Sequence, residues 1–373
     1  MRRRRARKSS RGSSTSSFPC SRGAICATCG ATRWWRRVDT VANLPSLPLL
    51  VTMGEPAGIG LEITLKAYRA LRETGPAFLL LDDPARVQAE AGDLSLAVIN
   101  DPGEAVAAFP RALPVLPLNL PYAVTPGRPD TRNNDAVMGA IARAAALAQK
   151  GEVAGIITNP IHKATLYASG FSYPGHTEYL AALTGEPEGA VMMLAVEGLR
   201  VVPLTIHIPL AEVPGRITPD LIIRTAETMA RALLRDFGIA RPRIAIAGLN
   251  PHAGEDGGIG REELTLIAPA IEALRGRGID VSGPRPADTM FHAAARAQYD
   301  AALCMYHDQA LIPLKTIDFE HGVNVTIGLP IIRTSPDHGT AFDIAGRGIA
   351  SPASLIAAIR LAGTMAQNRA RLS

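Results

Sequence analysis

Short apolar runs alternate with longer amphipathic runs along most of this chain of 373 residues. Runs of strand length include SLPLLVTM, AFLLLDD, VAGIIT, RIAIAGLN, DAALCMY and NVTIGL. Apolar residues have helical spacing in residues 61–74, 135–151, 218–237, 261–275 and 352–371. Strands that alternate with helices build a mostly parallel sheet with helices on both faces. The sequence therefore predicts an α/β fold with three layers, namely helix, sheet and helix.

The remaining segments are less regular. The adjoining runs VMMLAVEG and LRVVPLTI predict a hairpin over residues 191–206. Residues 84–118 predict two or three short strands, and residues 121–134 predict a loop rich in Pro, Gly and Asn. Most ionisable residues of segment 305–352 stand at the ends of short apolar runs. In α/β enzymes catalytic groups lie where strands give way to loops, so this segment points to an enzyme.

The net charge of +5 belongs to the N-terminal tail. Residues 1–38 hold 11 of the 39 Lys and Arg and none of the 34 acids, which leaves 28 basic against 34 acidic residues in the body. A body with a net charge of −6 (28 minus 34) does not predict a nucleic-acid partner. We expect residues 1–44 to be a disordered basic tail. It has no apolar core of a secretory signal; we favour a mis-assigned upstream start, with an organelle transit segment or a basic arm as alternatives.

Cysteine usage indicates a reducing compartment. Three of the four Cys lie in the tail, where Cys26 and Cys29 form a CxxC with no second pair or nearby His to complete a zinc site. Only Cys304 lies in the body, so disulfides do not stabilise the fold and a cytoplasmic location is expected. No apolar run is long enough to span a bilayer, so no membrane partner is expected.

Three His residues follow apolar runs in matching contexts: His207, His252 and His307. Parallel strands would deliver them to one edge of the sheet, where three nitrogens could hold a metal with an open position for substrate. The alternative is three unrelated polar loop residues. Asp288, in a turn before a short helix, could cap that helix or orient a metal-bound His.

Two further groups of residues suggest anion binding. TNPIHKATL and GHTEYL place His162, Lys163, His176 and Thr177 at helix starts, where free N–H groups favour phosphate or carboxylate; ordinary capping is the alternative. Lys315, Asn324 and Arg333 recur at nine-residue intervals and are interpreted as anion and hydroxyl binders, although each could be an ordinary solvated side chain.

Two Gly-punctuated segments could bind a nucleotide. GEPAGIG follows the first strand, but it is neither GxGxxG nor a P-loop, so its signal is weak. HGTAFDIAGRGIASP is the stronger signal, because Asp343 within it could hydrogen-bond the ribose hydroxyls and would repel an added 2′-phosphate.

Together, GEPAGIG, TNPIHK, GHTEYL, GLNPHAGE, PADTMF, MYHDQ, GVNVTIGLPIIRTSPDHGTA and AGRG resemble the 4-hydroxythreonine-4-phosphate dehydrogenase family of vitamin B6 biosynthesis. The resemblance implies NAD-dependent oxidation of the substrate at C3, with loss of CO2 to give 3-amino-2-oxopropyl phosphate. It also implies a divalent metal (zinc, or magnesium or cobalt) on His207, His252 and His307, and a homodimer with active sites at the subunit interface. The substrate contacts that it implies are His176, Thr177, Lys315, Asn324 and Arg333.

The fold class also resembles the isocitrate and isopropylmalate dehydrogenases, whose GDGIG and HGxAxDIAGxGIANP loops look like GEPAGIG and HGTAFDIAGRGIASP. That resemblance implies a lobe of residues 45–160 and 310–373 carrying the NAD loops, and a central lobe of residues 161–309 with the metal ligands and the dimer interface. It also implies a set of cofactor-binding residues: Gly54, Glu55, Gly58, Gly60, His338, Gly339, Asp343 and Gly346.

The proton acceptor is left open between Asp288 and Lys315, alone or through a water. Two rival functions also stay open at this point. One is a sister dehydrogenase of another phosphorylated hydroxy acid, such as 4-phospho-erythronate. The other is a three-His metallohydrolase, against which Asp343 and its loop argue because a hydrolase needs no dinucleotide.

Overall fold

The computed structural model describes residues 46–186 and 189–372. The predicted tail of residues 1–44, with its CxxC, lies outside the described residues. Within the described part, no helix is long and apolar enough to cross a membrane.

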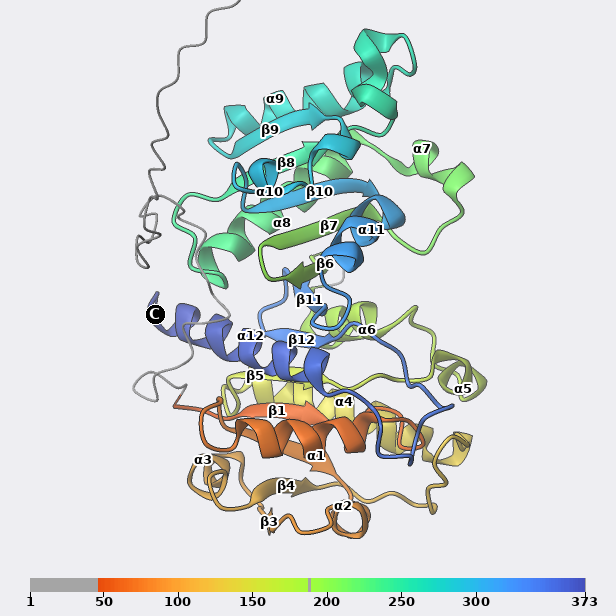
Figure 1. Ribbon diagram of the computed structural model, residues 1–373, viewed down its shortest axis with the longest axis vertical. Helices are drawn as coiled ribbons and strands as arrows, with labels where there is room; N and C mark the ends of the chain where they lie inside the picture. The colour runs from red at the N-terminus through yellow and green to blue at the C-terminus, as the bar shows by residue number, and fades with distance from the viewer. Residues whose placement is uncertain (1–45, 187–188, 373) are drawn as a thin grey trace, which may run out of the picture. The chain divides into compact units, whose positions relative to one another are not determined.

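The described strands form one twelve-stranded sheet in the order β3-β4-β2-β1-β5-β12-β11-β6-β7-β10-β8-β9 (Figure 1). Eight of its ladders are parallel and three are antiparallel, which confirms the mostly parallel sheet. The antiparallel ladders join β12, β11, β6 and β7 at the middle of the sheet, and they include the predicted hairpin of β6 and β7. The strand bounds are β1 Leu49–Thr52, β2 Phe78–Asp82, β3 Leu96–Val98, β4 Leu113–Pro117, β5 Gly155–Thr158, β6 Val191–Val196, β7 Leu199–Thr205, β8 Arg243–Ala247, β9 Asp280–Arg285, β10 Ala301–Tyr306, β11 Val323–Ile327 and β12 Arg333–Pro336.

Helices cover both faces of this sheet. The α-helices are α1 Gly60–Leu71, α2 Pro84–Glu90, α3 Ala105–Ala108, α4 Asn134–Gln149, α5 Lys163–Ala168, α6 His176–Thr184, α7 Val213–Arg216, α8 Pro219–Arg235, α9 Ala268–Gly276, α10 Ala293–Arg296, α11 His307–Ile317 and α12 Ala353–Ala370. The strand-to-helix alternation predicted from the sequence is confirmed for the long helices, with shifts of a few residues at their ends.

Strand β1 shows how the three layers arise. Its residues are fully buried, and because successive side chains of a strand point to opposite faces, they divide between two cores. Leu49 and Val51 pack in the cluster that contains residues of α1 and α12, whereas Leu50 packs with residues of α4. In the other half of the sheet, α8 and α9 cover one face and α11 covers the other. The predicted three-layer α/β fold is confirmed.

The structure adds to or corrects several local predictions. Residues 84–118 contain two short strands, β3 and β4, as predicted, and also the helices α2 and α3, which were not predicted. The short strands β9 and β12 and the helix α11 were not predicted, because Gly, Pro and Arg interrupt their apolar pattern. The helix expected over residues 261–275 begins with a π-helical turn, Glu263–Ile267, before α9.

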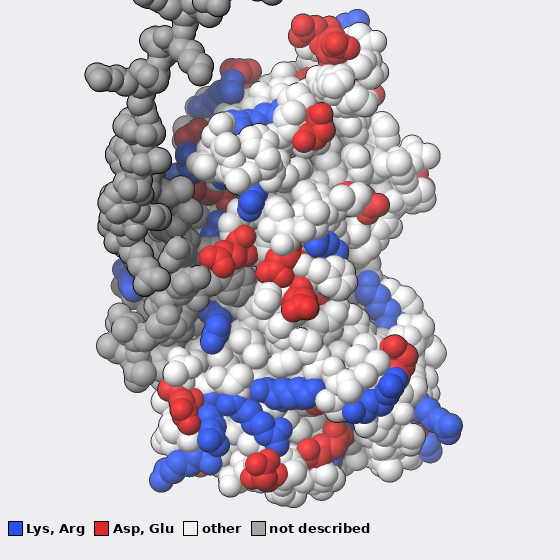
Figure 2. All heavy atoms as spheres, viewed as in Figure 1, with Lys and Arg blue, Asp and Glu red and all other residues white. Residues whose placement is uncertain are grey.

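The division into two lobes stays a prediction. The sheet runs without a break from strands of residues 49–158 and 323–336 into strands of residues 191–306. On the face drawn in Figure 2, Lys and Arg gather near α1 and the strands beside it, and Asp and Glu are interspersed among them. This face therefore carries charges of both signs.

Candidate active site

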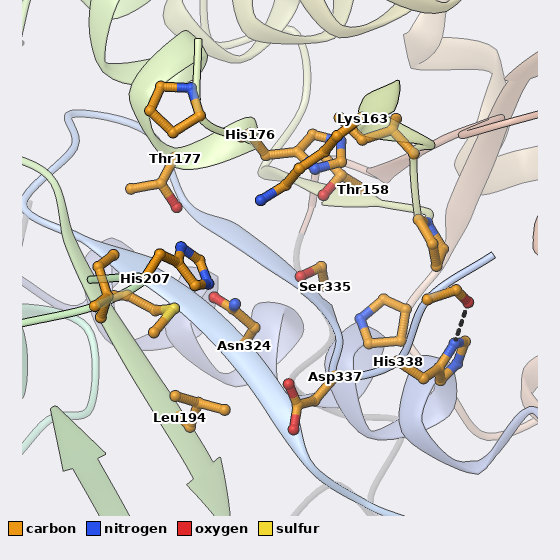
Figure 3. A pocket seen from close by; sticks show the side chains of 18 of the residues that line it. Thr158, Lys163, His176, Thr177, Leu194, His207, Asn324, Ser335, Asp337 and His338 are labelled. Atoms are coloured by element: carbon orange, nitrogen blue, oxygen red, sulfur yellow. Dashed lines mark hydrogen bonds between the residues drawn. The ribbon is translucent and has the colours of Figure 1, made fainter. Parts of the chain in front are cut away.

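A cavity of about 350 Å³ opens where the middle strands of the sheet meet the start of α6 and the start of α11. It is lined by side chains from the end of β5, from β6, β11 and β12, and from the residues that directly follow β7. Figure 3 shows that Lys163, Thr177, His207, Asn324 and Asp337 point toward the same open space. Of the residues that the sequence singled out, this cavity brings together Lys163, His176, Thr177, His207, His307, Asn324, Arg333, His338 and Gly339.

Arg333 is a buried cation at the floor of the cavity. It begins β12, and only 3% of its surface is exposed. Its guanidinium donates to Thr158 Oγ1 at 2.8 and 3.2 Å, and to Thr326 Oγ1 at 2.9 Å. No carboxylate of the described residues forms an ion pair with it, and burial lowers the pKa of Arg333 to about 10. A buried guanidinium held only by neutral acceptors is prepared for an anion that arrives with a ligand.

His176 and Thr177 occupy the first turn of α6, as the sequence predicted. The Nε2 atom of His176 is enclosed and has no hydrogen-bond partner among the described residues. Burial, with the nearby charges of Arg333 and Lys163, holds the pKa of His176 well below its usual value, so the ring is neutral at pH 7. The hydroxyl of Thr177 lies 3.3 Å from that of Thr326, which also binds Arg333. This end of the cavity is therefore cationic and contains an unused imidazole nitrogen.

His207 and His307 lie together at the opposite side. They follow β7 and β10, which are parallel neighbours, and their ring centroids are 5.9 Å apart. Burial, Lys163 and His307 lower the pKa of His207, which leaves its ring nitrogens able to act as ligands. Asp308 Oδ1 lies 2.7 Å from Nδ1 of His307, and a carboxylate there accepts a hydrogen bond from the Nδ1–H and leaves Nε2 free as a ligand. Two of the three expected metal ligands, His207 and His307, therefore lie close together at the cavity and have nitrogens suited to bind a metal.

His252 does not join them. It follows β8, the other neighbour of β10, but the exposed turn Pro251–Gly257 carries it away from the cavity. Residues 46–186 and 189–372 contain no group of three His, Cys, Asp or Glu side chains able to hold a metal ion.

Two of the three expected ligands have strained backbones. His207 has φ 51° and His252 has φ 53°, in the left-handed region that non-Gly residues rarely adopt. Such a conformation costs about 1–2 kcal/mol per residue. Strain of this kind persists where the surrounding structure enforces it, and it often marks functional positions.

Lys315 and Asp288 lie at different sides of α11. The sequence placed Lys315 at the end of an apolar run, but the structure places it in the last turn of this helix. Its Nζ is 2.8 Å from Oδ2 of Asp337, which lines the cavity, so Lys315 adjoins the site through that carboxylate. Asp288 is exposed and lines a separate cavity with Asp308 and Ile312 of α11. The turns that carry Asp288 and His252 are in contact with each other.

The sequence reading missed Thr158, Ser335 and Asp337, all of which line the cavity. Asp337 directly precedes His338 in the SPDHGTA run, so its place at the end of β12 could have revealed it. Thr158 begins the TNPIHK motif, but its contact with Arg333 spans 175 residues of sequence and could not be predicted from it.

The two segments expected to bind the cofactor touch each other. The amide of Ile59 donates to the carbonyl of Thr340 at 3.1 Å, and Gly58 packs against Thr340. Gly54 has φ +70°, and a Cβ there would lie 2.6 Å from the carbonyl oxygen of Pro160. Gly60 begins α1, and burial raises the pKa of Glu55. Asp343 and Gly346 lie on the exposed part of the second segment, which starts at the cavity with His338 and Gly339.

The fold and the cavity together define an α/β protein whose central cavity places a buried guanidinium beside several imidazole side chains. Over residues 76–362 the chain matches the family described as Pyridoxal phosphate biosynthetic protein PdxA, and it belongs to that family.

Relatives in sequence and structure agree with this assignment. The 4-hydroxythreonine-4-phosphate dehydrogenase of Caulobacter vibrioides is 52% identical over 331 residues, which cover 87% of this chain and 99% of the relative. The crystal structure of 4-hydroxythreonine-4-phosphate dehydrogenase from Klebsiella pneumoniae has a TM-score of 0.79 and 41% identity, covering 87% of this chain and 100% of the other. The terephthalate 1,2-cis-dihydrodiol dehydrogenase of Burkholderia xenovorans LB400 has a TM-score of 0.62 and 32% identity, covering 85% and 98%. The family resemblance expected from the sequence is confirmed.

Proposed function

We infer that this chain oxidises 4-phosphohydroxy-L-threonine at C3 and releases CO2 to give 3-amino-2-oxopropyl phosphate, a step of pyridoxine 5′-phosphate biosynthesis. Family membership and the names of the relatives support the reaction. The observation that carries it in the structure is Arg333, a buried guanidinium without a carboxylate partner in the described residues, beside the enclosed Nε2 of His176. A substrate with both a phosphate and a carboxylate would supply the missing negative charge.

Substrate binding is assigned to the cationic end of the cavity. Arg333, Asn324, His176 and Thr177 bind the anionic and hydroxyl groups of the substrate, in line with the expectation from the sequence. Lys315, held by Asp337, completes this set at the rim. Because Thr326 contacts both Arg333 and Thr177, binding at one of them fixes the position of the other.

The metal site is assigned to His207 and His307, with His252 supplied by a second copy of the chain. When bound, a divalent ion such as Zn²⁺, Mg²⁺ or Co²⁺ would lower the pKa of the substrate hydroxyl and polarise the developing ketone. His207 is kept neutral, and Asp308 orients the ring of His307. These residues act by positioning nitrogen lone pairs toward the space where the hydroxyl of the substrate would lie.

A homodimer accounts for His252 and Asp288, two expected site residues that lie away from the cavity. His252 and Asp288 are both exposed and sit on contacting turns. Exposed apolar side chains lie near the expected site residues: Ile312 (64% exposed) lines a cavity with Asp288, Leu210 (70%) lines one with His207 and His307, and Ile259 (46%) follows the turn of His252. Apolar side chains gathered beside an incomplete site favour burial against another subunit. In such a pair each subunit would complete the site of its partner.

The cofactor is assigned to the touching segments 54–60 and 338–346, and the low cysteine content favours a cytoplasmic enzyme. When bound, NAD would accept the hydride from C3. Asp343 would take the ribose hydroxyls and disfavour the 2′-phosphate of NADP. The cavity begins at His338, so this arrangement puts the dinucleotide beside the substrate.

The proton of the C3 hydroxyl needs an acceptor within hydrogen-bond reach. Lys315 with Asp337 is the candidate within one chain, and Asp288 is the candidate from a second chain. After oxidation, the resulting β-keto acid loses its carboxylate as CO2, and the electrons of that bond pass to the enolate oxygen.

The decisive assay follows NADH formation from 4-phosphohydroxy-L-threonine with and without a chelator. We expect NADH formation that chelation abolishes and that added divalent ion restores. Absence of NADH would refute the reaction, and chelator-insensitive NADH formation would refute the metal role. 4-Phospho-erythronate serves as the matched control substrate, since faster turnover of that compound would favour the sister dehydrogenase.

A further inference from the structure

The turn Pro251–Gly257, drawn in teal beyond β8 in Figure 1, has an unusual backbone. Five consecutive residues, from His252 to Asp256, have φ between 46° and 80° and so form a left-handed turn. Only Gly254 among them lacks a Cβ. A left-handed run of side-chain-bearing residues does not persist unless contacts outside the run hold it.

One buried carboxylate, Glu263, holds the residues that lead into this run. It lies in the π-helical turn before α9, and 2% of its surface is exposed. Its Oε1 accepts the backbone amides of Leu249 at 2.8 Å and Asn250 at 2.7 Å. Its Oε2 accepts the side-chain amide of Asn250 at 2.9 Å. The carboxylate thus binds the two residues that lead from β8 into the left-handed turn.

Among the described residues the carboxylate of Glu263 accepts only from amide groups and forms no ion pair with a Lys or Arg, although a buried carboxylate normally requires such a partner. Its hydrogen bonds go to the loop, which also closes over it. A Cβ on Gly254 would lie 2.5 Å from Oε2, and a Cβ on Gly248 would lie 3.1 Å from Oε1. The absence of side chains at these two positions lets the loop wrap around the carboxylate.

A second contact joins this loop to the end of β10, which is followed by the expected metal ligand His307. Gln309, in the first turn of α11, donates to the carbonyl of Gly248 at 2.8 Å and accepts from the amide of Met305 at 2.7 Å. The loop that presents His252 is therefore tied to the strand end that presents His307.

We propose that Glu263 is a positioning residue of the metal site: it holds the left-handed turn that presents His252 to the site completed by a second copy of the chain. This rests on the proposed function, in which His252 is a metal ligand. Glu263 would touch neither metal nor substrate and acts through the backbone amides of Leu249 and Asn250 and the side chain of Asn250.

The test measures zinc affinity of the full-length dimer by competition with a chromophoric chelator. Every variant carries Ser at Cys26 and Cys29, so that thiolates of the N-terminal segment add no zinc site. We expect Glu263→Gln to bind zinc about ten- to a hundredfold more weakly, the usual range when a supporting group is altered. The amide keeps one acceptor oxygen but replaces the other with a donor that faces the side-chain amide of Asn250.

Two further variants serve as comparisons for the loss of zinc affinity in Glu263→Gln. Asn250→Ala removes the side-chain hydrogen bonds to Glu263 and to Glu262 but keeps both backbone bonds to Glu263, so it should weaken zinc binding by less. Glu272→Gln, on the exposed side of α9 where Glu272 pairs with Arg275, should leave zinc affinity unchanged. Excess zinc should restore the kcat of Glu263→Gln, which a loss of folding alone would not allow.

His252→Ala separates this proposal from the function on which it rests. If His252→Ala keeps full zinc affinity, the ligand assignment itself is wrong. If His252→Ala loses zinc while Glu263→Gln and Asn250→Ala bind it like the parent, the positioning role is refuted and the ligand assignment stands. Should Glu263→Gln fail to fold, unchanged zinc affinity in Asn250→Ala would overturn the proposal.

Discussion

Replacing Arg333 tests the central claim about substrate binding. Arg333→Met keeps the length of the side chain but removes the charge and all the donors, and Arg333→Lys keeps the charge but loses the planar fork. In the structure the guanidinium already donates to Thr158 and Thr326, so it is held in place before any anion arrives.

The expected size follows from the contacts that the fork can make. A hydrogen bond to a charged group contributes about 1.5–3 kcal/mol, so a two-pronged contact to a phosphate or carboxylate contributes about 3–6 kcal/mol. We expect Arg333→Met to lower kcat/KM by about 10²–10⁴-fold, since 1.4 kcal/mol is tenfold. Arg333→Lys, which keeps one charged donor, should lose about half that energy. The fold should persist, because removing a buried cation that lacks a carboxylate relieves a desolvation cost.

The assay is steady-state kinetics with 4-phosphohydroxy-L-threonine, alongside urea unfolding of the same samples. Arg369→Lys is the matched control, because Arg369 is also largely buried but is paired with Asp236 at 2.6 Å. That control should lose stability and keep kcat/KM. The reasoning is wrong if Arg333→Met keeps kcat/KM within about threefold of the parent, a loss smaller than one hydrogen bond.

Three further outcomes are expected. Asp308→Asn should weaken zinc binding about tenfold by releasing the ring of His307; unchanged zinc affinity in the chelator competition would contradict the orienting role. Since the folded pKa of His176 lies below its unfolded value, the unfolded chain binds the extra proton below about pH 6.5. The free energy of unfolding should therefore fall as pH drops from 7 to 5, and His176→Gln should show a shallower fall; equal slopes in urea titrations would oppose this. Gly54→Ala should destabilise the fold by about 1–3 kcal/mol, because φ is +70° and the new Cβ would meet the carbonyl of Pro160, and an unchanged melting temperature would argue against it.

Local pattern was sufficient for the elements with long regular periods. The helix α8 and the strands β1, β2, β8 and β10 lie where the apolar spacing predicted them. Helix α11 escaped detection because Pro313 interrupts it, and β12 because its four residues include Arg333 and a Pro. In both cases packing against neighbouring elements outweighs weak local propensity.

The candidate site, too, was predictable only in part. The His residues after β7, β8 and β10 could be predicted, because parallel strands end at one edge of a sheet. The sequence could not predict that only His207 and His307 meet while a left-handed turn carries His252 away. A few backbone dihedral angles in the loops decide where each His lies.

By itself, the sequence determined the three-layer α/β class, the family resemblance and the residue types available for the chemistry. These depend on periodicity and on short motifs, which are local properties. Only the tertiary structure decided that Asp337 pairs with Lys315, that Arg333 lies buried on Thr158 without a carboxylate, and that Glu263 holds the turn of His252. Two of these contacts join residues 13 or more positions apart, and the third joins residues 175 apart, so they exist only after packing and register have set the distances.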